Sequence, residues 1–270
     1  MDKISPTPDA ELNAVLVELV KGAQAVLGNN FVSAYLQGSF ALGDWDADSD
    51  VDFLIVIDHD VSDIELSALQ AMHARIYQLE SGWAKHLEGS YFPRQILKSG
   101  DPTKKDLWYL DNTFDHLILS DHDNTLVVRW VVREYGIALA GVDPKKLIDP
   151  VSPDDLRQEV LAIMHEWADD IFAGRWEMNN QWAQPFAAIS YCRMIHTLHT
   201  GRIASKPSGA QWVKDNLDDR WAGLIQRALD ERPNPSLKVR QAANPDEVNS
   251  TLDFIRYILK VSQSYEIDKP

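Results

Sequence analysis

Residues 35–56, YLQGSFALGDWDADSDVDFLIV, carry the pattern from which the fold can be inferred. It begins with a β-prone segment that leads into Gly38 and Ser39. Eleven residues after Ser39 come Asp50 and Asp52, and this pair opens the apolar run VDFLIVI, which is typical of a buried strand. Strand side chains alternate between the two faces of a sheet. The spacing therefore places both carboxylates on one face, roughly 6.5 Å apart along the chain.

Carboxylates in this arrangement can bind Mg²⁺, a hard cation that prefers oxygen ligands and that also binds nucleotide phosphates. Gly38 allows the backbone to approach a phosphate closely, and Ser39 adds a hydroxyl beside the exposed N–H groups of a following helical turn. Each part alone is weak evidence for such a site, because D-x-D pairs are common in acidic chains and Gly-Ser dipeptides are common in loops. Their order, followed by the buried strand, makes the combination specific for a nucleotide-phosphate site.

Two other interpretations of the acidic run are excluded. Asp occupies every second position from Asp44 to Asp52, as in an EF-hand loop. The sixth residue counted from Asp44 is Ser49 rather than Gly, however, and the twelfth is Ile55 rather than Glu. The sequence also contains no G-x-x-x-x-G-K-[ST] phosphate loop.

The composition restricts the partners. The chain has 270 residues, 41 of them acidic and 26 basic, and a formal net charge of −15. Such a field repels phosphate backbones, so we expect no nucleic-acid partner, whereas a small cation would be attracted. Cys192 is the single cysteine and excludes an internal disulfide, which fits a reducing compartment. Without a signal-like segment or an apolar run of ~20 residues, the sequence predicts a cytoplasmic protein and no membrane partner.

The pattern of elements predicts two domains. Strands are expected at 31–37, 51–57, 84–92, 107–109 and 116–120, and helices at 12–23, 62–79 and 124–135. Prolines cluster between residues 144 and 153, and beyond them the strand signals vanish. Helical patterns there cover 154–173, 183–200, 207–231 and 246–264. We predict an α/β (α+β) domain with a mixed sheet over residues 1–150, followed by an all-helical bundle over residues 151–270.

At residues 35–56 the chain resembles the DNA polymerase β-like nucleotidyltransferase superfamily, whose hallmark is Gly-Ser, a spacer and Asp-x-Asp at a strand start. Within that superfamily it is most similar to the streptomycin/spectinomycin adenylyltransferases. IALAGVDPKKLID at 137–149 resembles their link into the helical domain, and CRMIHTLHTGRIASKPSGAQW at 192–212 resembles the signature of that domain. The resemblance implies transfer of AMP from ATP to a hydroxyl of an aminoglycoside-type antibiotic, with Mg²⁺ on Asp50 and Asp52 and release of pyrophosphate.

The resemblance also implies roles for residues outside the Asp pair. Glu88, in a strand expected beside that pair, matches a third carboxylate that acts as general base toward the acceptor hydroxyl. Arg193 and Lys206 match two cations that hold the triphosphate, so that they bind nucleotide together with Gly38 and Ser39. The implied partners are ATP and a small cationic acceptor.

The chain departs from this family at two places. MNNQWAQP at 178–185 carries no carboxylate, although similar enzymes have acidic and Trp residues there that grip the aminoglycoside. Ala228 and Leu229 stand where a Tyr near the nucleotide is expected. The acceptor therefore stays open: a protein side chain, another small alcohol and a non-aminoglycoside antibiotic are alternatives. A non-catalytic nucleotide-binding regulator is a further alternative, but three crowded carboxylates are electrostatically costly without a metal and argue against it.

Overall fold

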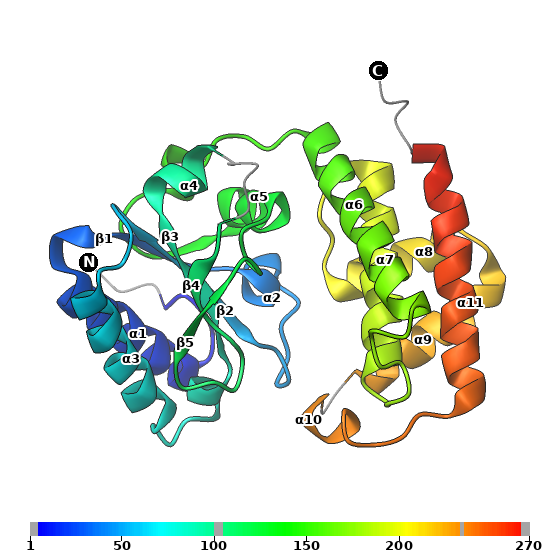
Figure 1. Cartoon of the computed structure of the whole chain (residues 1–270), viewed down its shortest axis with the longest axis horizontal. Coiled ribbons are helices and arrows are strands. Elements are labelled where there is room, and N and C mark those ends of the chain that lie inside the picture. Colours follow the sequence, from blue (N-terminus) through cyan, green and yellow to red (C-terminus); the bar gives the residue numbers. More distant parts are fainter. Residues whose placement is uncertain (1–4, 100–104, 233–234, 266–270) are drawn as a thin grey trace. The chain divides into compact units, whose positions relative to one another are not determined.

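The computed structural model describes residues 5–99, 105–232 and 235–265. Its internal contacts divide the chain into two compact units, Met1–Val151 and Ser152–Pro270. The first unit contains a mixed six-stranded sheet with helices, and the second is helical (Figure 1). The predicted fold class, an α/β (α+β) domain with a mixed sheet followed by an all-helical bundle, is confirmed.

The sheet of the first unit has the strand order β5-β4-β3-β2-β1-β6. Its strands are β1 (Phe31–Leu36), β2 (Val51–Ile57), β3 (Leu87–Pro93), β4 (Leu107–Leu110), β5 (Leu117–Ser120) and β6 (Ile137–Ala140). β2 and β3 are parallel, whereas the other four neighbouring pairs are antiparallel. The helices of this unit are α1 (Ala10–Leu27), α2 (Gly38–Leu42), α3 (Asp63–Tyr77), α4 (Arg94–Ser99) and α5 (Leu126–Tyr135). α3 lies in the crossover that two parallel neighbours require.

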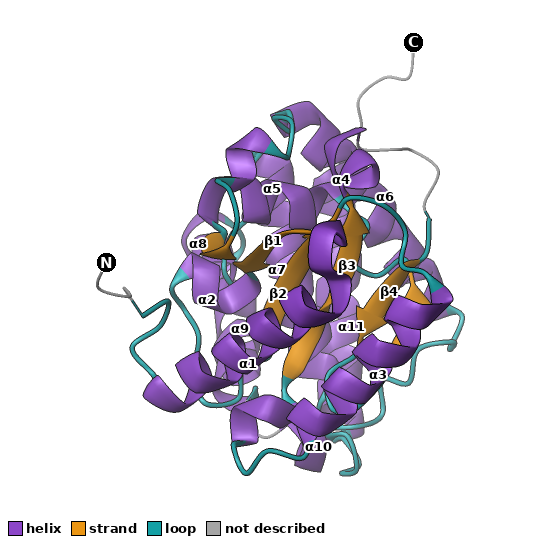
Figure 2. Ribbon diagram, turned by 90° about the vertical axis from the view of Figure 1, so that its left-hand side faces the viewer, coloured by secondary structure: helices purple, strands orange, loops and turns teal. Residues whose placement is uncertain are grey.

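β2 is buried on both faces, which explains its unbroken apolar sequence. Phe53 and Ile55 belong to a core cluster with residues of α1 and α3, and Figure 2 shows these two helices crossing one face of the sheet. Leu54 and Val56 belong to a second cluster, with residues of α4 and α5. Asp52 shares a face with Leu54 and Val56 because side chains alternate along the strand. Its carboxylate therefore lies on the α5 face, at the N-terminal end of β2.

Two strands of this unit differ from the prediction. The strand expected over 84–92 begins at Leu87, because Gly82–Lys85 form a 3₁₀ turn. β6 (Ile137–Ala140) was expected to be part of an interdomain link. It is a strand because it pairs with β1 at the edge of the sheet, and nothing in its four residues shows this pairing.

The second unit is built around α7. Its helices are α6 (Pro153–Phe172), α7 (Ala183–Thr200), α8 (Lys206–Asn216), α9 (Ala222–Glu231), α10 (Pro235–Lys238) and α11 (Pro245–Ser262). α7 packs against α6, α8, α9 and α11, and Cys192 on it is buried. The single helix predicted over 207–231 is wrong: Leu217 is extended and separates α8 from α9. None of the helices in the described ranges is both long and apolar enough to cross a membrane.

The core between the sheet and α3 contains a titratable group, His73, which is 2% exposed. Its Nε2 lies 2.8 Å from the hydroxyl of Tyr91 on β3, and burial lowers its pKa to about 3. The folded state thus keeps the ring neutral, whereas the unfolded chain binds a proton below about pH 6.5. Stability is therefore full above that pH and is lost progressively as the pH falls toward the folded pKa.

We expect the free energy of unfolding to fall by about 2 kcal/mol more in the wild type than in His73→Gln between about pH 7.5 and about pH 5. Gln keeps polar atoms near the Tyr91 hydroxyl but does not titrate. Urea unfolding of both proteins at the two pH values measures the difference. Equal losses in the two proteins would show that His73 is not the acid-sensitive group.

Candidate active site

The parallel pairing of β2 and β3 brings the predicted carboxylates together. Asp52 lies directly opposite Glu88 in the register of the two strands, and Asp50 stands one residue before β2. Adjacent strands are ~4.8 Å apart, so side chains on the same face of such a pair are neighbours. Both Asp50 and Asp52 act electrostatically on Glu88. The structure thus places all three carboxylates in one cluster.

The environment of Glu88 disfavours its charge. Burial is the main cause that raises its pKa, to about 8, and the negative charge of Asp52 is the second. Asp50 and Asp123 raise the pKa further, while the hydrogen bond from Tyr109 lowers it. Because the charges of crowded carboxylates repel one another, the cluster is most stable when a cation neutralises them.

Gly38 shapes the position of the Asp52 side chain. Its φ is +58°, and a Cβ atom at this position would lie 1.9 Å from Asp52 Oδ2. The backbone N–H of Gln37 donates a hydrogen bond of 2.8 Å to the Asp52 carbonyl, which joins the end of β1 to the start of β2. The close approach seen at Gly38 is therefore to the Asp52 carboxylate. Its predicted approach to a phosphate stays a prediction.

Gly38→Ala and Gly43→Ala form a matched pair of variants. Both glycines have a positive φ, but nothing lies within 4 Å of a Cβ at Gly43. We expect each variant to lose about 1–2 kcal/mol of unfolding free energy from backbone strain alone. Only Gly38→Ala should also lose the transferase activity that the resemblance predicts, by at least tenfold (about 1.4 kcal/mol), because its methyl group must displace the Asp52 carboxylate. Urea unfolding and an initial-rate assay test this, and equal activities in both variants would contradict it.

Ser39 provides a buried polar atom without a partner. It lies in α2 directly after Gly38, and its Oγ makes no hydrogen bond to any described residue. A buried hydroxyl left unsatisfied costs about 1–3 kcal/mol. The same oxygen is shielded from solvent in this structure, so the predicted nucleotide-binding role of Ser39 stays a prediction.

Two side chains that the sequence did not indicate donate hydrogen bonds to these carboxylates. The Tyr109 hydroxyl on β4 donates to Glu88 Oε1 at 2.6 Å. The side-chain amide of Asn112, just beyond β4, donates to Asp50 Oδ1, and its Oδ1 lies 3.2 Å from His86 Nδ1. The β-prone pattern at 107–109 is the available signal for β4, but it does not show which strand β4 pairs with.

The side chain of Asp123 is a fourth carboxylate near Glu88, and its charge acts on Glu88. Ser90, on the same face of β3 as Glu88, donates from its hydroxyl to Asp123 Oδ2 at 2.7 Å. Burial raises the pKa of Asp123, whereas the Ser90 hydrogen bond and the nearby His122 lower it. His122 Nε2 in turn lies 3.7 Å from Glu88 Oε1. The loop between β5 and α5 therefore contributes to the environment of Glu88, which no local sequence pattern indicates.

The predicted triphosphate-binding cations lie in the helical unit, in adjoining segments. Arg193 is on α7, and its Nε donates to the carbonyl of Ala204 at 2.9 Å. Lys206 is the first residue of α8 and follows the N-cap Ser205. The Arg193 hydrogen bond thus holds the loop that leads to Lys206. Lys206 makes no ion pair within the described residues.

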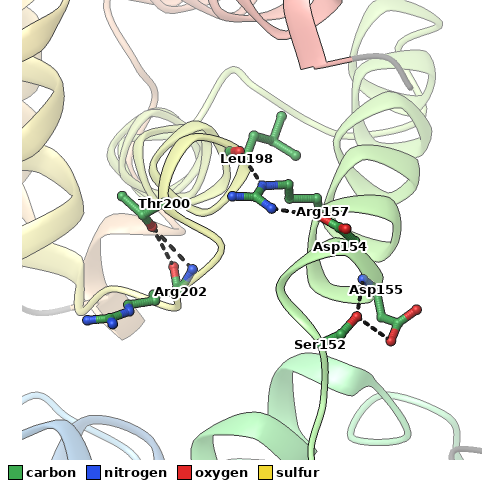
Figure 3. A network of polar contacts seen from close by, with 7 residues as sticks. All are labelled: Ser152, Asp154, Asp155, Arg157, Leu198, Thr200 and Arg202. Carbon is green, nitrogen blue, oxygen red and sulfur yellow. Dashed lines mark hydrogen bonds and ion pairs between the residues drawn. The ribbon is translucent and has the colours of Figure 1, made fainter. Parts of the chain in front are cut away.

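Polar contacts fix the end of α7 and the turn after it (Figure 3). Arg157 on α6 donates from Nε to the carbonyl of Leu198 at 2.9 Å and pairs with Asp154 at 2.8 Å. Beyond the helix end, the backbone N–H of Arg202 donates to Thr200 Oγ1 at 3.2 Å. The segment between α7 and α8 is therefore anchored on its α6 side as well as by Arg193.

The carboxylate cluster fits a Mg²⁺ site that needs a nucleotide to be complete. Within the described residues, no group of three or more His, Cys, Asp and Glu is arranged to hold a metal ion. Mg²⁺ in nucleotide sites is usually bound by one or two carboxylates, with phosphate oxygens and waters as its other ligands. Asp50 and Asp52 supply that number of carboxylates, and the charges of both raise the pKa of Glu88 beside them, in addition to burial, which is the main cause.

Comparisons with known proteins give similar proteins over most of the chain. It is 23% identical over 241 residues to the spectinomycin 9-adenylyltransferase of Staphylococcus aureus, which covers 78% of this chain and 88% of that protein. It is 22% identical over 268 residues to the aminoglycoside (3'') (9) adenylyltransferase of Shigella flexneri, with 92% and 94% covered.

A solved structure shares the fold. The crystal structure of the spectinomycin adenyltransferase AAD(9) from Enterococcus faecialis with ATP and spectinomycin superposes with a TM-score of 0.67. The two chains are 18% identical, and the match covers 92% of this chain and 98% of that one.

Two family models match successive parts of the chain. Residues 24–107 match the model described as "Nucleotidyltransferase domain", which spans β1 to the start of β4. Residues 146–260 match the model described as "Aminoglycoside adenylyltransferase, C-terminal domain". The carboxylate cluster lies within the first match, and Arg193 and Lys206 lie within the second. The chain therefore carries, in this order, a region that matches the nucleotidyltransferase domain and a region that matches the C-terminal domain of the aminoglycoside adenylyltransferases.

Proposed function

We propose that this nucleotidyltransferase transfers AMP from ATP to a hydroxyl group of a small cationic acceptor of the aminoglycoside type and releases pyrophosphate. The observation that carries this proposal is the placement of Glu88 directly opposite Asp52, with Asp50 beside them, on parallel strands of a nucleotidyltransferase domain. One strand pair supplies both the carboxylates for a cation and the carboxylate for a base.

Glu88 is the proposed general base. It takes the proton from the acceptor hydroxyl, whose oxygen bonds to the α-phosphorus of ATP while the bond from that phosphorus to the leaving pyrophosphate breaks. Tyr109 donates to Oε1 of Glu88, which orients the carboxyl group and leaves Oε2 to accept the proton. The raised pKa makes Glu88 a stronger base than an ordinary carboxylate.

Asp50 and Asp52 are the proposed Mg²⁺ ligands. Mg²⁺ bound there would neutralise charge on the phosphate oxygens of the nucleotide. Contacts within the chain position both carboxylates: Asn112 donates a hydrogen bond to Asp50, and Gly38 leaves room for the Asp52 carboxylate. Such outer contacts orient metal ligands and are typically worth 10–100-fold in affinity.

Lys206 and Arg193 are proposed to bind the triphosphate. We expect Lys206→Ala to weaken ATP binding by about 10- to 150-fold, the range for a charge-assisted hydrogen bond of ~1.5–3 kcal/mol. Arg193→Ala should weaken it similarly, in part because its bond to Ala204 is also lost. Lys214→Ala, on the same helix but paired with Gln226, is the control. Calorimetric titration with ATP measures the affinities. Unchanged values in both test variants would place the triphosphate elsewhere.

An acceptor other than an aminoglycoside is the second candidate, and residues 178–185 favour it. The stretch has no carboxylate, and the side chain of Asn180 in it accepts a hydrogen bond of 2.9 Å from the backbone N–H of Ala183, the first residue of α7. Trp182 stacks on Phe186 with ring centroids 4.6 Å apart. These residues offer aromatic surface rather than negative charge to an acceptor.

Pyrophosphate release with a panel of acceptors tests the proposed function. The purified protein is incubated with ATP and Mg²⁺ and with spectinomycin, streptomycin, a neutral sugar alcohol, or a protein extract. Release that depends on an aminocyclitol or aminoglycoside supports the leading proposal. Release only with the neutral alcohol or the extract supports the second candidate, and no release with any acceptor contradicts both.

A further inference from the structure

The turn between β4 and β5 contains a strained residue close to the carboxylate cluster. Thr113 has a φ of +72° and is the one non-glycine residue with a positive φ in the described ranges. The backbone N–H of Phe114 donates to the Asp111 carbonyl at 3.0 Å, so Thr113 is the third residue of a β-turn. A positive φ at that position normally requires Gly or Asn, and a β-branched residue is strained there. The side chain of Thr113 is exposed, so its own packing does not explain the conformation.

Hydrogen bonds to two other segments hold this turn in place. The backbone N–H of Thr113 donates to the carbonyl of Lys85 at 3.1 Å, just before β3. Beside it, His86 Nδ1 lies 3.2 Å from Asn112 Oδ1. The backbone N–H of Val51 donates to the His86 carbonyl at 2.7 Å, which ties the start of β2 to the same segment. A strained residue persists only where its surroundings determine the conformation, and here these bonds do so.

The conformation of the turn decides what the Asn112 amide contacts. Its nitrogen donates to Oδ1 of Asp50, one residue before β2. Its oxygen therefore faces His86, whose Nδ1–H donates to it. Turning the amide over would place its oxygen against the Asp50 carboxylate, so the two hydrogen bonds fix one orientation. Asn112 thus holds the Asp50 side chain, and His86 holds Asn112.

We propose that Thr113 and His86 are positioning residues, which together present the Asn112 amide to Asp50 and thereby set the orientation of that carboxylate for a divalent cation. The inference rests on the proposed role of Asp50 and Asp52 as cation ligands. A turn that relaxed to a negative φ would carry Asn112 away from Asp50. Binding of the cation would then have to order the carboxylate, at a cost in affinity.

The affinity for a Mn²⁺–nucleotide complex tests the proposal without turnover. Mn²⁺ replaces Mg²⁺, because both prefer oxygen ligands, and α,β-methylene-ATP replaces ATP, because its bridging carbon prevents the transfer. Calorimetric titration of the full chain gives the Kd. We expect Asn112→Ala to raise the Kd about 10–100-fold, the usual contribution of a contact that orients a metal ligand. His86→Phe should raise it less, because Asn112 keeps its bond to Asp50 and loses only the bond that fixes its amide.

Two substitutions at Thr113 test the backbone conformation itself. Thr113→Pro should raise the Kd as Asn112→Ala does, because Pro fixes φ near −65° and has no N–H for the bond to Lys85. Thr113→Gly should restore binding, because Gly adopts a positive φ without strain, and should raise the melting temperature by about 2–4 °C. Asp115→Gly is its control: Asp115 is exposed in the same loop and has no positive φ, so this variant should melt no higher than the wild type.

Asn30→Ala is the matched control for Asn112→Ala. The Asn30 amide also joins two segments: its nitrogen donates to Glu65 Oε1 at 3.0 Å, and its oxygen accepts from the backbone N–H of His59 at 3.0 Å. Asn30 directly precedes β1 and lies at the end of β2 that is away from Asp52. Its replacement should lower the melting temperature and leave the Kd unchanged, provided that the titration is run below the melting temperature.

Asp52→Asn separates failure of the turn from failure of the cation site. If Asp52→Asn binds the complex like the wild type, the proposed cation site is wrong, and the inference on the turn falls with it. If Asp52→Asn weakens binding but Asn112→Ala and Thr113→Pro bind like the wild type, the cation site stands and the inference is overturned. A rise in Kd in Asn30→Ala as large as that in Asn112→Ala also overturns it, because general destabilisation would then explain both.

Discussion

Asp52→Asn is expected to reduce nucleotidyl transfer by at least about 10³-fold while the protein stays folded. The substitution keeps the shape of the side chain but removes half of the carboxylate pair proposed to bind Mg²⁺, whose charge neutralisation is worth several kcal/mol in the transition state. In the absence of metal, the free energy of unfolding should be unchanged or higher, because one of the charges that repel Glu88 is gone. Initial rates at saturating ATP and urea unfolding measure the two effects.

Asp48→Asn is the matched control, because Asp48 belongs to the same acidic run and is exposed. It should keep nearly full activity. If Asp52→Asn keeps more than about a tenth of the wild-type rate, a loss below ~1.4 kcal/mol, the metal assignment is wrong. If both variants lose activity equally, the effect reflects the net charge of the loop rather than a ligand.

Glu88→Gln should lower the maximal rate by about 10²–10⁴-fold, the usual contribution of a general base, with ATP and acceptor binding near normal. Gln keeps an oxygen that can accept the Tyr109 hydrogen bond, so the side chain should stay in place. Single-turnover rates with saturating substrates, together with the affinity for each substrate, separate the loss of a base from the loss of a binding group.

The pH dependence gives an independent check on Glu88. A base must be deprotonated, so wild-type activity should fall as the pH drops through the pKa of Glu88. Burial and Asp52 raise that pKa to about 8 without a cation, and a bound cation lowers it, so the acidic limb should lie below about pH 8. The Gln variant should lack this limb. A variant that keeps the limb, or that loses acceptor affinity instead of rate, would make Glu88 a cation-binding residue rather than the base.

The sequence predicted the parts of the site that local patterns encode. An apolar run as continuous as VDFLIVI is typical of a strand covered on both faces, and β2 is such a strand. Strand alternation then places Asp50 and Asp52 on one side. The resemblance placed Glu88 on a neighbouring strand, and the structure has it directly opposite Asp52. The catalytic and binding roles of these residues stay predictions.

The parts that the sequence did not predict depend on contacts between distant segments. Tyr109 reaches Glu88 because β4 pairs with β3, and Asn112 reaches Asp50 because a turn follows β4. Neither the pairing of β4 with β3 nor the turn after β4 is marked by a local sequence pattern. Gly38 is predicted to make room for a phosphate, but the atom nearest to a Cβ at this position belongs to the Asp52 carboxylate, and no periodicity in the sequence shows that these two residues are in contact.

The position of a radioactive phosphorus label after reaction with ATP shows whether the protein transfers a nucleotidyl group. The protein is incubated with Mg²⁺, with an acceptor that supports pyrophosphate release, and with ATP labelled at either the α- or the γ-phosphorus. The Glu88→Gln variant is treated in parallel. We expect the wild type to move the α-label to the acceptor and to release the γ-label in pyrophosphate, and the variant to do neither at a comparable rate. Label from the γ-phosphorus on the acceptor would mean phosphoryl rather than nucleotidyl transfer, and the proposed reaction would then be wrong.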